Sequence, residues 1–477
     1  MRLSTLCQGT VNQRGRARRA NLAVALVCLI TLGSLIGGLT AGFTAREAEA
    51  QTRDISFIRD TEIENTMRVY LAPIFDAAGL DPGSVKIHLI LDDAINAFVA
   101  GGMNIFIHTG LLTNADGPGE VIGVLAHEVG HITGGHLARF KGNAENAQIQ
   151  GLAAMILGGA AAIAAGEPAG VSAAVALGQQ VGQRSFLSYT RQMEQSADQA
   201  AMDFLRDAGF TPRGYRDVLE KLQRRAKLYS ARSNPYEQSH PVTSDRLAFV
   251  ENQIANWPAD MPGIPDSYTD LHQRMRAKLL AYIQDPSRTL EQFAAASQDV
   301  SARYARSIAH MRAYDREEAL VLAEGLIADN PNDPFFYELK GDIFLNTGDV
   351  ANAIEPYEKA VEMLPWAALI RINLARALLE LNDTKHEEAA LDHLLKARRY
   401  EPDSTELWRL TAGVYTRLGE SGQAALAQAE RAFRSGRNAQ AKTYADRAMS
   451  ELAEGSASWL RAQDISLQLD ERERQKK

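Results

Sequence analysis

The stretch GEVIGVLAHEVGHITGGHLARF, residues 119–140, joins a helical pattern to a metal-binding pattern. Its apolar residues recur on one side of a helix, which predicts a helix over the whole stretch. His127 and His131 are four positions apart, so both imidazoles lie on one helix face about one turn apart. Two such nitrogens can bind one Zn²⁺ at ~2.0–2.1 Å. Glu128 lies beside them and is positioned to act as a general base toward water activated by the metal.

A catalytic zinc site needs a third protein ligand and one open position. A third histidine of the metzincin type would lie six residues after His131, but that residue is Leu137. His136 is one position off, about 100° around the expected helix, which favours a surface position or an indirect contact through another residue. The third ligand is therefore a carboxylate or a distant histidine.

A second predicted helix, residues 191–208, carries Glu194 and Asp198 one turn apart. This spacing lets Glu194 reach the metal while Asp198 accepts a hydrogen bond from an imidazole N–H and fixes its tautomer. Such a pair alone is weak evidence, because exposed helices contain many. Combined with the upstream histidines, the pair predicts the rest of the metal site.

Residues upstream of the histidines predict a small antiparallel sheet. A helix is expected over 55–82, a strand over 85–90, and a hairpin of 97–99 with 104–107. We expect the second hairpin strand to be an edge that binds extended substrate through its backbone, with a plain core strand as the alternative. The predicted edge residues are Asn104, Ile105, Phe106, Ile107 and His108.

The N-terminus has the composition of a secretory signal peptide. A basic stretch precedes an apolar run from about 21 to 44, and Ala48-Glu49-Ala50 matches an A-x-A cleavage site, which predicts Gln51 as the mature start. An uncleaved membrane anchor is the alternative, since the run is long enough to span a bilayer. Both cysteines, Cys7 and Cys28, lie in this segment, so the mature chain has no thiol chemistry. The formal net charge of −8, more negative after cleavage, argues against a nucleic-acid partner.

Residues 151–183 are rich in Ala, Gly and Leu and are interrupted by Gly166-Glu167-Pro168. Each half is shorter than the ~20 residues that span a bilayer. A helical hairpin packed on protein is therefore expected, with peripheral membrane contact as the alternative. Further helices are predicted over 191–208 and 212–230, followed by a Pro/Asp-rich linker near 256–270.

A repeat begins near residue 300. Pro331, Pro365 and Pro402 recur 34 and 37 residues apart. Small residues recur between the prolines, namely Gly341, Ala375 and Gly413, then Ala353, Ala390 and Ala425, and then Ala360, Ala397 and Ala432. This period, with small residues where paired helices touch, is typical of tetratricopeptide repeats. Because one helical pair cannot bury its own apolar face, the repeats must stack, and the stack offers a concave surface for a peptide or a partner protein.

Several motifs together resemble the HtpX-like and CAAX-prenyl-protease-like gluzincins, and within them the periplasmic BepA-type peptidases with tetratricopeptide repeats. The resemblance covers roughly residues 55–255, and the repeats behind it match the same architecture. The matching motifs are Asn96-Ala97-Phe98 with the Gly-rich hairpin, Gly110-Leu111-Leu112, residues 126–131, residues 136–139, residues 194–198, and Ser239-His240-Pro241 followed by Arg246.

The resemblance implies a zinc endopeptidase outside the cytoplasm, in envelope protein quality control and outer-membrane protein assembly. It places the metal ligands at His127, His131 and Glu194 and the base at Glu128. His240 and Arg246 match residues near the family's active site. His240 is expected either to occupy the fourth zinc position and keep the enzyme closed, or to stabilise the oxyanion together with Arg246. A helix-entry residue without a chemical role is the third alternative.

The predicted fold is mainly α. A signal peptide occupies 1–50, an α+β gluzincin domain with one Zn²⁺ occupies 51–255, a linker with connecting helices occupies 256–299, and an α-solenoid of tetratricopeptide repeats occupies 300–477. The predicted function is hydrolysis of misfolded or stalled envelope proteins in the periplasm, with the repeats recruiting substrate or assembly machinery. The alternatives are an enzyme anchored in the inner membrane and facing the periplasm, and a chaperone or adaptor whose proteolysis is mostly shut.

Overall fold

The computed structural model describes residues 56–100, 102–136, 191–228, 240–258 and 263–475. The expected signal peptide, both cysteines and the expected hairpin at 151–183 lie outside these residues. None of the helices in the described ranges combines the length and the apolar content that crossing a membrane requires.

A four-stranded sheet forms one layer of the N-terminal half. Its strands are β1 (Phe57–Ile58), β2 (Lys86–Ile90), β3 (Ala97–Ala100) and β4 (Asn104–His108), in the order β1-β2-β4-β3. β1 pairs with β2 and β3 with β4 in antiparallel fashion, but β2 and β4 are parallel. The sheet is therefore mixed, and the prediction of an antiparallel sheet is wrong for this pair. β3 is an outer strand that runs opposite to β2. The chain then turns back, so that β4 lies between β2 and β3 and runs in the same direction as β2.

The prediction that 104–108 is an edge strand is also wrong. β4 lies between β2 and β3 and pairs with both. Ile105 and Ile107 are fully buried on the inner side of the sheet, which makes β4 the central part of the core. Among the described residues β3 forms the edge next to β4.

Helices cover the inner face of this sheet. α1 begins after Asp60, whose carboxylate accepts a hydrogen bond from the Ile63 amide at 2.9 Å. α1 and β3 both pack against α3. An unlabelled helix at residues 191–207 also belongs to this half. The other elements are α1 (Thr61–Ala77), η2 (Pro82–Ser84), α2 (Thr109–Asn114), α3 (Pro118–Thr133), α6 (Arg213–Leu228) and α8 (Ser244–Ala255).

α3 is shorter than the predicted helix over 119–140. It ends at Thr133, and Gly135 then adopts φ 60°, a left-handed conformation that glycine tolerates and that ends helices. Because α3 ends before His136, the angle of about 100° expected for a continuous helix does not describe the direction of the His136 side chain. His136 directly follows the Gly134-Gly135 turn that ends α3, and it is buried.

The region predicted as a linker contains α9 (Asp266–Ile283) and α10 (Pro286–Gln292). α9 packs against α1 on one side and against α11 (Val300–Arg312) on the other. One cluster of buried apolar side chains extends from Ile58 in β1 to Ile343 in α13 (Pro334–Asn346). The sheet-containing half and the first repeats therefore share a hydrophobic core.

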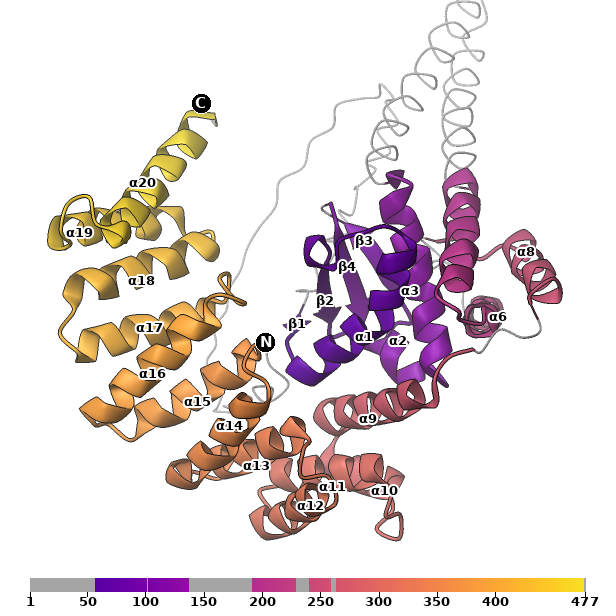
Figure 1. Cartoon of the computed structure of the whole chain (residues 1–477), viewed down its shortest axis with the longest axis horizontal. Coiled ribbons are helices and arrows are strands. Elements are labelled where there is room, and N and C mark those ends of the chain that lie inside the picture. The colour runs from indigo at the N-terminus through magenta and orange to yellow at the C-terminus, as the bar shows by residue number, and fades with distance from the viewer. Residues whose placement is uncertain (1–55, 101, 137–190, 229–239, 259–262, 476–477) are drawn as a thin grey trace, which may run out of the picture.

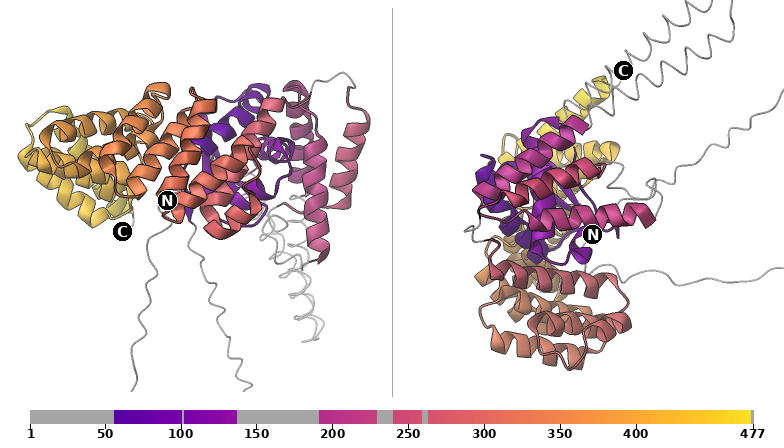
Figure 2. Two further views of the ribbon diagram at one scale, coloured as in Figure 1. Left: turned by 90° about the horizontal axis from the view of Figure 1, so that it is seen from below. Right: turned by 90° about the vertical axis from the view of Figure 1, so that its right-hand side faces the viewer.

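Antiparallel helix pairs make up the C-terminal half. α11 pairs with α12 (Arg316–Asp329), α13 (Pro334–Asn346) with α14 (Val350–Met363), α15 (Ala368–Glu380) with α16 (Thr384–Ala397), α17 (Thr405–Arg417) with α18 (Ser421–Arg434), and α19 (Asn438–Glu451) with α20 (Ala457–Gln475). The pairs stack into a curved array that starts next to α9 and ends at α20 (Figure 1). Figure 2 shows the array lying beside the sheet-containing half. The fold is an α-solenoid following an α+β domain, as the repeats predicted.

The recurring small residues lie where paired helices touch. Ala353, Ala390 and Ala425 are almost fully buried. A Cβ on Gly341 would come within 2.8 Å of the Tyr357 ring, so that close approach requires glycine. Gly413 differs, because a Cβ there would meet nothing within 4 Å. The repeat pattern thus has a packing reason at most of its positions, but not at Gly413.

One edge of the array faces the sheet-containing half. The loops after α12, α14 and α16, which carry the recurring prolines, lie along this edge. Residues 329–335 approach the N-terminal part of α1 and α9, and Trp366 and Tyr400 line a cavity of about 470 Å³ together with residues of α1. The repeat period therefore places equivalent loops of the array against the sheet-containing half of the same chain.

Candidate metal centre

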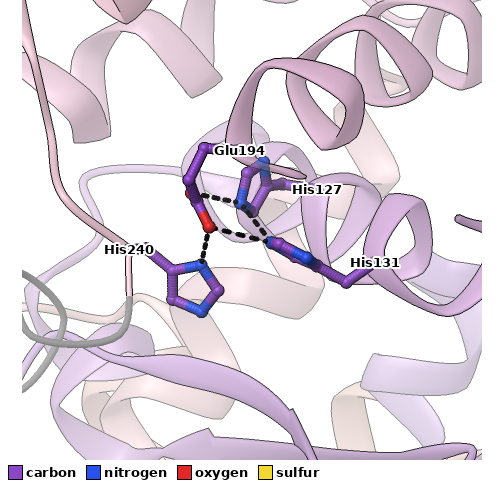
Figure 3. A group of neighbouring side chains, drawn as sticks. All are labelled: His127, His131, Glu194 and His240. Carbon is purple, nitrogen blue, oxygen red and sulfur yellow. Dashed lines mark hydrogen bonds and ion pairs between the residues drawn. The ribbon is translucent and has the colours of Figure 1, made fainter. Parts of the chain in front are cut away.

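Four side chains converge at the C-terminal part of α3. His127, His131, Glu194 and His240 each offer one ligand atom, and these atoms lie within 4.8 Å of one another. Figure 3 shows the four side chains directed toward a common point. They come from α3, from the helix at 191–207 and from the segment before α8. The site is thus assembled from three elements that are distant in the sequence.

His127 is completely buried and is held through both ring nitrogens. Its Nε2 atom lies 3.3 Å from Glu194 Oε2, on the side of the cluster. Its Nδ1 atom lies 3.0 Å from Asp198 Oδ1 and 3.0 Å from the Tyr215 hydroxyl. A carboxylate at Nδ1 favours a proton on that nitrogen and leaves Nε2 free to bind a cation.

His131 has a similar arrangement with a different partner. Its Nε2 atom lies 3.3 Å from Glu194 Oε1, and its Nδ1 atom lies 2.9 Å from Nδ1 of His136. His136 therefore contacts a histidine of the cluster without joining it. Of the two positions that the sequence suggested for His136, the structure has the indirect contact.

Behind the cluster, Arg246 holds the two carboxylates of the second helix. Its Nη1 atom lies 2.8 Å from Glu194 Oε2, and its Nε and Nη2 atoms lie 2.7 and 2.8 Å from the Asp198 carboxylate. The Tyr215 hydroxyl donates to Asp198 at 2.6 Å and accepts from Arg246 at 2.9 Å. All of these groups are buried, so the network fixes the orientation of Glu194 and of the ring of His127.

Glu128 and His240 form the open side of the cluster. Both carboxylate oxygens of Glu128 are buried and make no hydrogen bond to any described residue. The nearest ionic partner is Nε2 of His240, 3.6 Å from Glu128 Oε1, while Nδ1 of His240 lies 3.1 Å from Glu194 Oε1. A buried carboxylate without a hydrogen bond is costly, which indicates a group that acts on something bound at the site.

The electrostatics of the cluster follow from burial and from these contacts. Burial raises the pKa of Glu128. Burial disfavours the charged form of His127, but hydrogen bonds to Asp198 and Glu194 outweigh this and raise its pKa to about 9. Burial lowers the pKa of His131 to about 3. Burial works against ionised Glu194, yet nearby His240 and the other histidines hold its pKa well below the ordinary value.

The donor set fits a zinc ion. Two imidazole nitrogens and one carboxylate, with a further position beside a glutamate, are the ligands of one class of catalytic zinc site. Protons and metal ions compete for imidazole nitrogens, because histidine binds metal in its neutral form. Glu194, whose Oε2 atom lies 3.3 Å from Nε2 of His127, would attract a cation to that nitrogen, while Asp198 keeps the proton on Nδ1.

One residue of the network was not identified from the sequence. Tyr215 lies in α6, 88 positions from His127, and its hydroxyl contacts Asp198 and His127. Neither its spacing nor its neighbours mark it as part of a metal site. None of the residues Asn104–His108 belongs to the group of four. The strand that packs against α3 is β3, which precedes them in the chain.

Two histidines one turn apart on a buried helix, a glutamate from a second helix and a glutamate beside the first histidine define a metallopeptidase site of the gluzincin type. Residues 59–254 match the model of peptidase family M48. This chain belongs to peptidase family M48 and is a metallopeptidase.

Similar proteins extend the match beyond these residues. The beta-barrel assembly-enhancing protease of Escherichia coli O157:H7 is 30% identical over 377 residues, covering 77% of this chain and 75% of that protein. The protein with this name from Yersinia pestis is 28% identical over 365 residues, covering 74% and 72%. Metalloprotease LoiP of Escherichia coli (strain K12) is 25% identical over 177 residues, covering 36% of this chain and 64% of that protein.

Proposed function

We propose that this chain is a zinc-dependent endopeptidase of the bacterial cell envelope that hydrolyses misfolded or stalled envelope proteins. The observation that carries the proposal is the convergence of His127, His131 and Glu194 next to the buried carboxylate of Glu128, which makes no hydrogen bond to any described residue. The names of the relatives support a role in outer-membrane protein assembly. The predicted leader at 1–50 supports a periplasmic location.

In this proposal His127, His131 and Glu194 hold the zinc ion. When bound, zinc polarises the substrate carbonyl and lowers the pKa of water. Glu128 takes a proton from the attacking water and delivers it to the nitrogen of the leaving amine. Burial prepares Glu128 for this role, because it raises the pKa of the carboxyl toward the range where it can both accept and release a proton.

Asp198, Tyr215 and Arg246 are positioning residues. Arg246 is buried, and its guanidinium already binds Asp198, Glu194 and the Pro241 carbonyl. We therefore propose that Arg246 orients the ligands and does not contact the oxyanion, which was its predicted role. Hydrogen bonds of this kind commonly affect metal affinity by about 10–100-fold.

His240 is the candidate regulator. Its ligand atom belongs to the same cluster as those of the three zinc-holding residues, which favours the interpretation that it occupies the fourth position and keeps the enzyme closed. The alternative role is support of the oxyanion. We propose that His240 occupies the fourth zinc position, because an unregulated peptidase among unfolded envelope proteins would be harmful.

Substrate recognition combines an edge strand with the array. β3 replaces the predicted 104–108 strand as the place where an extended peptide adds to the sheet, since within the described residues it is an outer strand and it packs against α3. The curved array is proposed to recruit substrate or the assembly machinery. A chaperone or adaptor in which proteolysis is mostly shut is the second candidate, and the contacts of His240 with Glu194 and Glu128 favour it.

Metal analysis beside hydrolysis tests the proposal. Glu194→Gln, His127→Ala and His131→Ala should each lose zinc, whereas Glu128→Gln should retain one zinc ion and lose peptide hydrolysis, because a ligand determines affinity and the base determines turnover. Peptidase activity in purified Glu128→Gln would overturn the mechanism. Full function of Glu128→Gln in cells, with no hydrolysis, would favour the chaperone.

A further inference from the structure

Aromatic side chains cross the outer face of the sheet in a row. The row consists of Phe57 on β1, His88 on β2, Phe106 on β4 and Phe98 on β3. The rings of His88 and Phe106 stack at 4.8 Å between centroids, and those of Phe106 and Phe98 stack at 5.0 Å. Phe57 lies 6.2 Å from both His88 and Phe106 and is 40% exposed. The row therefore runs from one edge of the sheet to the other.

The row ends at the strand nearest the metal centre. Phe98 is partly exposed and belongs to β3, which pairs with β4 on one side and packs against α3. Among the described strands, none lies beyond β3. A peptide that adds to β3 would therefore become the next strand in the row, about 4.8 Å away.

The hydrogen-bond pattern determines which substrate residue faces Phe98. The Asn96 carbonyl accepts a bond from the His108 amide at 3.0 Å, so the Asn96 backbone points toward β4. The backbone N–H and C=O groups of successive residues in a strand point to opposite sides. Those of Phe98 therefore also point toward β4, whereas those of Ala97 and Val99 point toward the open side of β3.

An antiparallel peptide would bond the backbone of Ala97 and Val99. Phe98 would then face one substrate residue in a non-hydrogen-bonded pair, where Cα atoms are about 4.5 Å apart and side chains lie closest. Aromatic side chains favour each other in such pairs. The substrate residue opposite Phe98 is thus distinguished by geometry from its neighbours, whose side chains point to the other face.

From this geometry we propose that Phe98 is a specificity-determining residue that selects an aromatic side chain at one position of an extended polypeptide substrate. The inference rests on the proposed peptidase function and narrows its substrate class. Strands of outer-membrane β-barrels alternate apolar and polar residues and carry bands of aromatic residues. A segment of this type that is not yet folded would present, when extended along β3, aromatic side chains on the face that Phe98 occupies.

The test uses fluorogenic peptides in which each position in turn carries Phe or Leu. The zinc-loaded full chain should prefer Phe by about three- to tenfold in kcat/KM at one position. Phe98→Leu should abolish this preference, mainly through KM, while Phe98→Tyr should retain it. Phe57→Leu is the matched control, because Phe57 lies at the opposite edge of the row and cannot reach the peptide.

Several outcomes would overturn the inference. They are an unchanged preference in Phe98→Leu, an equal loss on every peptide, and the absence of any aromatic preference in the wild type. A lower melting temperature of Phe98→Leu without a change in selectivity would show that the ring only packs within this chain. Loss of the preference in Phe57→Leu would show that selection does not occur at Phe98.

Binding gives a second readout that does not depend on turnover. Fluorescence anisotropy of the Phe and Leu peptides on Glu128→Gln should show the same ratio of affinities, and the additional change Phe98→Leu should remove it. Equal affinities would overturn the inference while leaving hydrolysis intact. If the wild type binds with this preference but hydrolyses no peptide, the proposed peptidase function fails and the inference about Phe98 stands.

Discussion

Arg59 and Glu401 lie 342 positions apart in the chain and form a paired ionic contact, with Arg59 Nη1 2.7 Å from Glu401 Oε2 and Nη2 bonded to the other carboxylate oxygen. The same guanidinium also binds Glu64 of α1, with Nε 2.6 Å from Oε1. Arg59 thus links the first helix of the catalytic half to a proline-bearing loop of the array.

We expect this contact to stabilise the docked array modestly. The Arg59 side chain is 34% exposed, and solvent screening limits such pairs to about 1 kcal/mol or less. A double-mutant cycle with Arg59→Met and Glu401→Gln, measured by urea unfolding, should give a coupling free energy of this size that decreases with added salt. Strict additivity at low salt would show that the contact contributes nothing to docking.

Tyr215→Phe should weaken zinc binding without preventing folding. The substitution keeps the ring and removes the hydroxyl that donates to Asp198 at 2.6 Å. Loss of such an indirect contact typically reduces metal affinity by about 10–100-fold. Competition with a chelator measures the change, and turnover at saturating zinc should remain close to that of the wild type. Tyr70→Phe, whose hydroxyl bonds the Tyr268 carbonyl away from the site, is the control.

His240→Ala should increase basal proteolysis several-fold if His240 closes the site, because the substitution frees the position beside Glu128. The initial rate on an unfolded substrate measures this, together with zinc content. A lower kcat at unchanged zinc content would instead assign the oxyanion role. Identical kinetics for the variant and the wild type would eliminate both roles.

Glu338 predicts a pH dependence of stability. Burial is the main cause that raises its pKa to about 8, while Lys278 opposes the shift. An unfolded glutamate has a pKa of about 4.3, so from about pH 4.3 to 8 the folded state binds more protons than the unfolded state at this residue. This contribution to stability is therefore present at low pH and is lost as the pH rises toward 8.

Glu338→Gln should remove that loss. Its free energy of unfolding, relative to the wild type, should increase between about pH 5 and 8 and change little below pH 4. Urea unfolding across this range provides the measurement. Glu358→Gln, at an exposed position of α14, should show no such trend. Parallel curves for wild type and Glu338→Gln would contradict the assigned pKa.

The local patterns of the chain predicted most of its elements, because they are short-range properties. The two histidines of α3 are one turn apart in any helix, and the proline period marks helical pairs that must stack on their neighbours. The grouping of His127, His131 and Glu194 was predicted, and the structure places them together. Their chemical roles remain predictions until metal content and turnover are measured.

The incorrect predictions concern long-range pairing. Alternation along 104–108 shows that Ile105 and Ile107 point inward, but it does not show which strands flank them. Strand order depends on the path of the whole chain, so the central place of β4 was not predictable from that segment. Tyr215 was missed for the same reason, since only the packing of α6 against α3 brings it to Asp198.

The helix end after Thr133 is different, because the sequence carried the signal. Gly134 and Gly135 follow one another directly, and glycine just past a helix is a common stop. The apolar pattern continues through Leu137 and Phe140, and it predicts a longer helix than this stop allows. A helix that ends before Gly134 places His136 beyond a two-residue turn, from which its ring reaches back to His131.

The buried cluster shared by the sheet, α9 and the first repeats has a consequence for how the protein loses its structure. Cooperative unfolding units tend to coincide with regions of continuous packing. The apolar cluster from Ile58 to Ile343 is separate from the one that joins α18, α19 and α20. The array should therefore fray from its C-terminal end, while the metal site unfolds only with the first repeats. Hydrogen exchange should then be fastest in the terminal helices, and a cut near residue 300 should destroy the peptidase rather than release it.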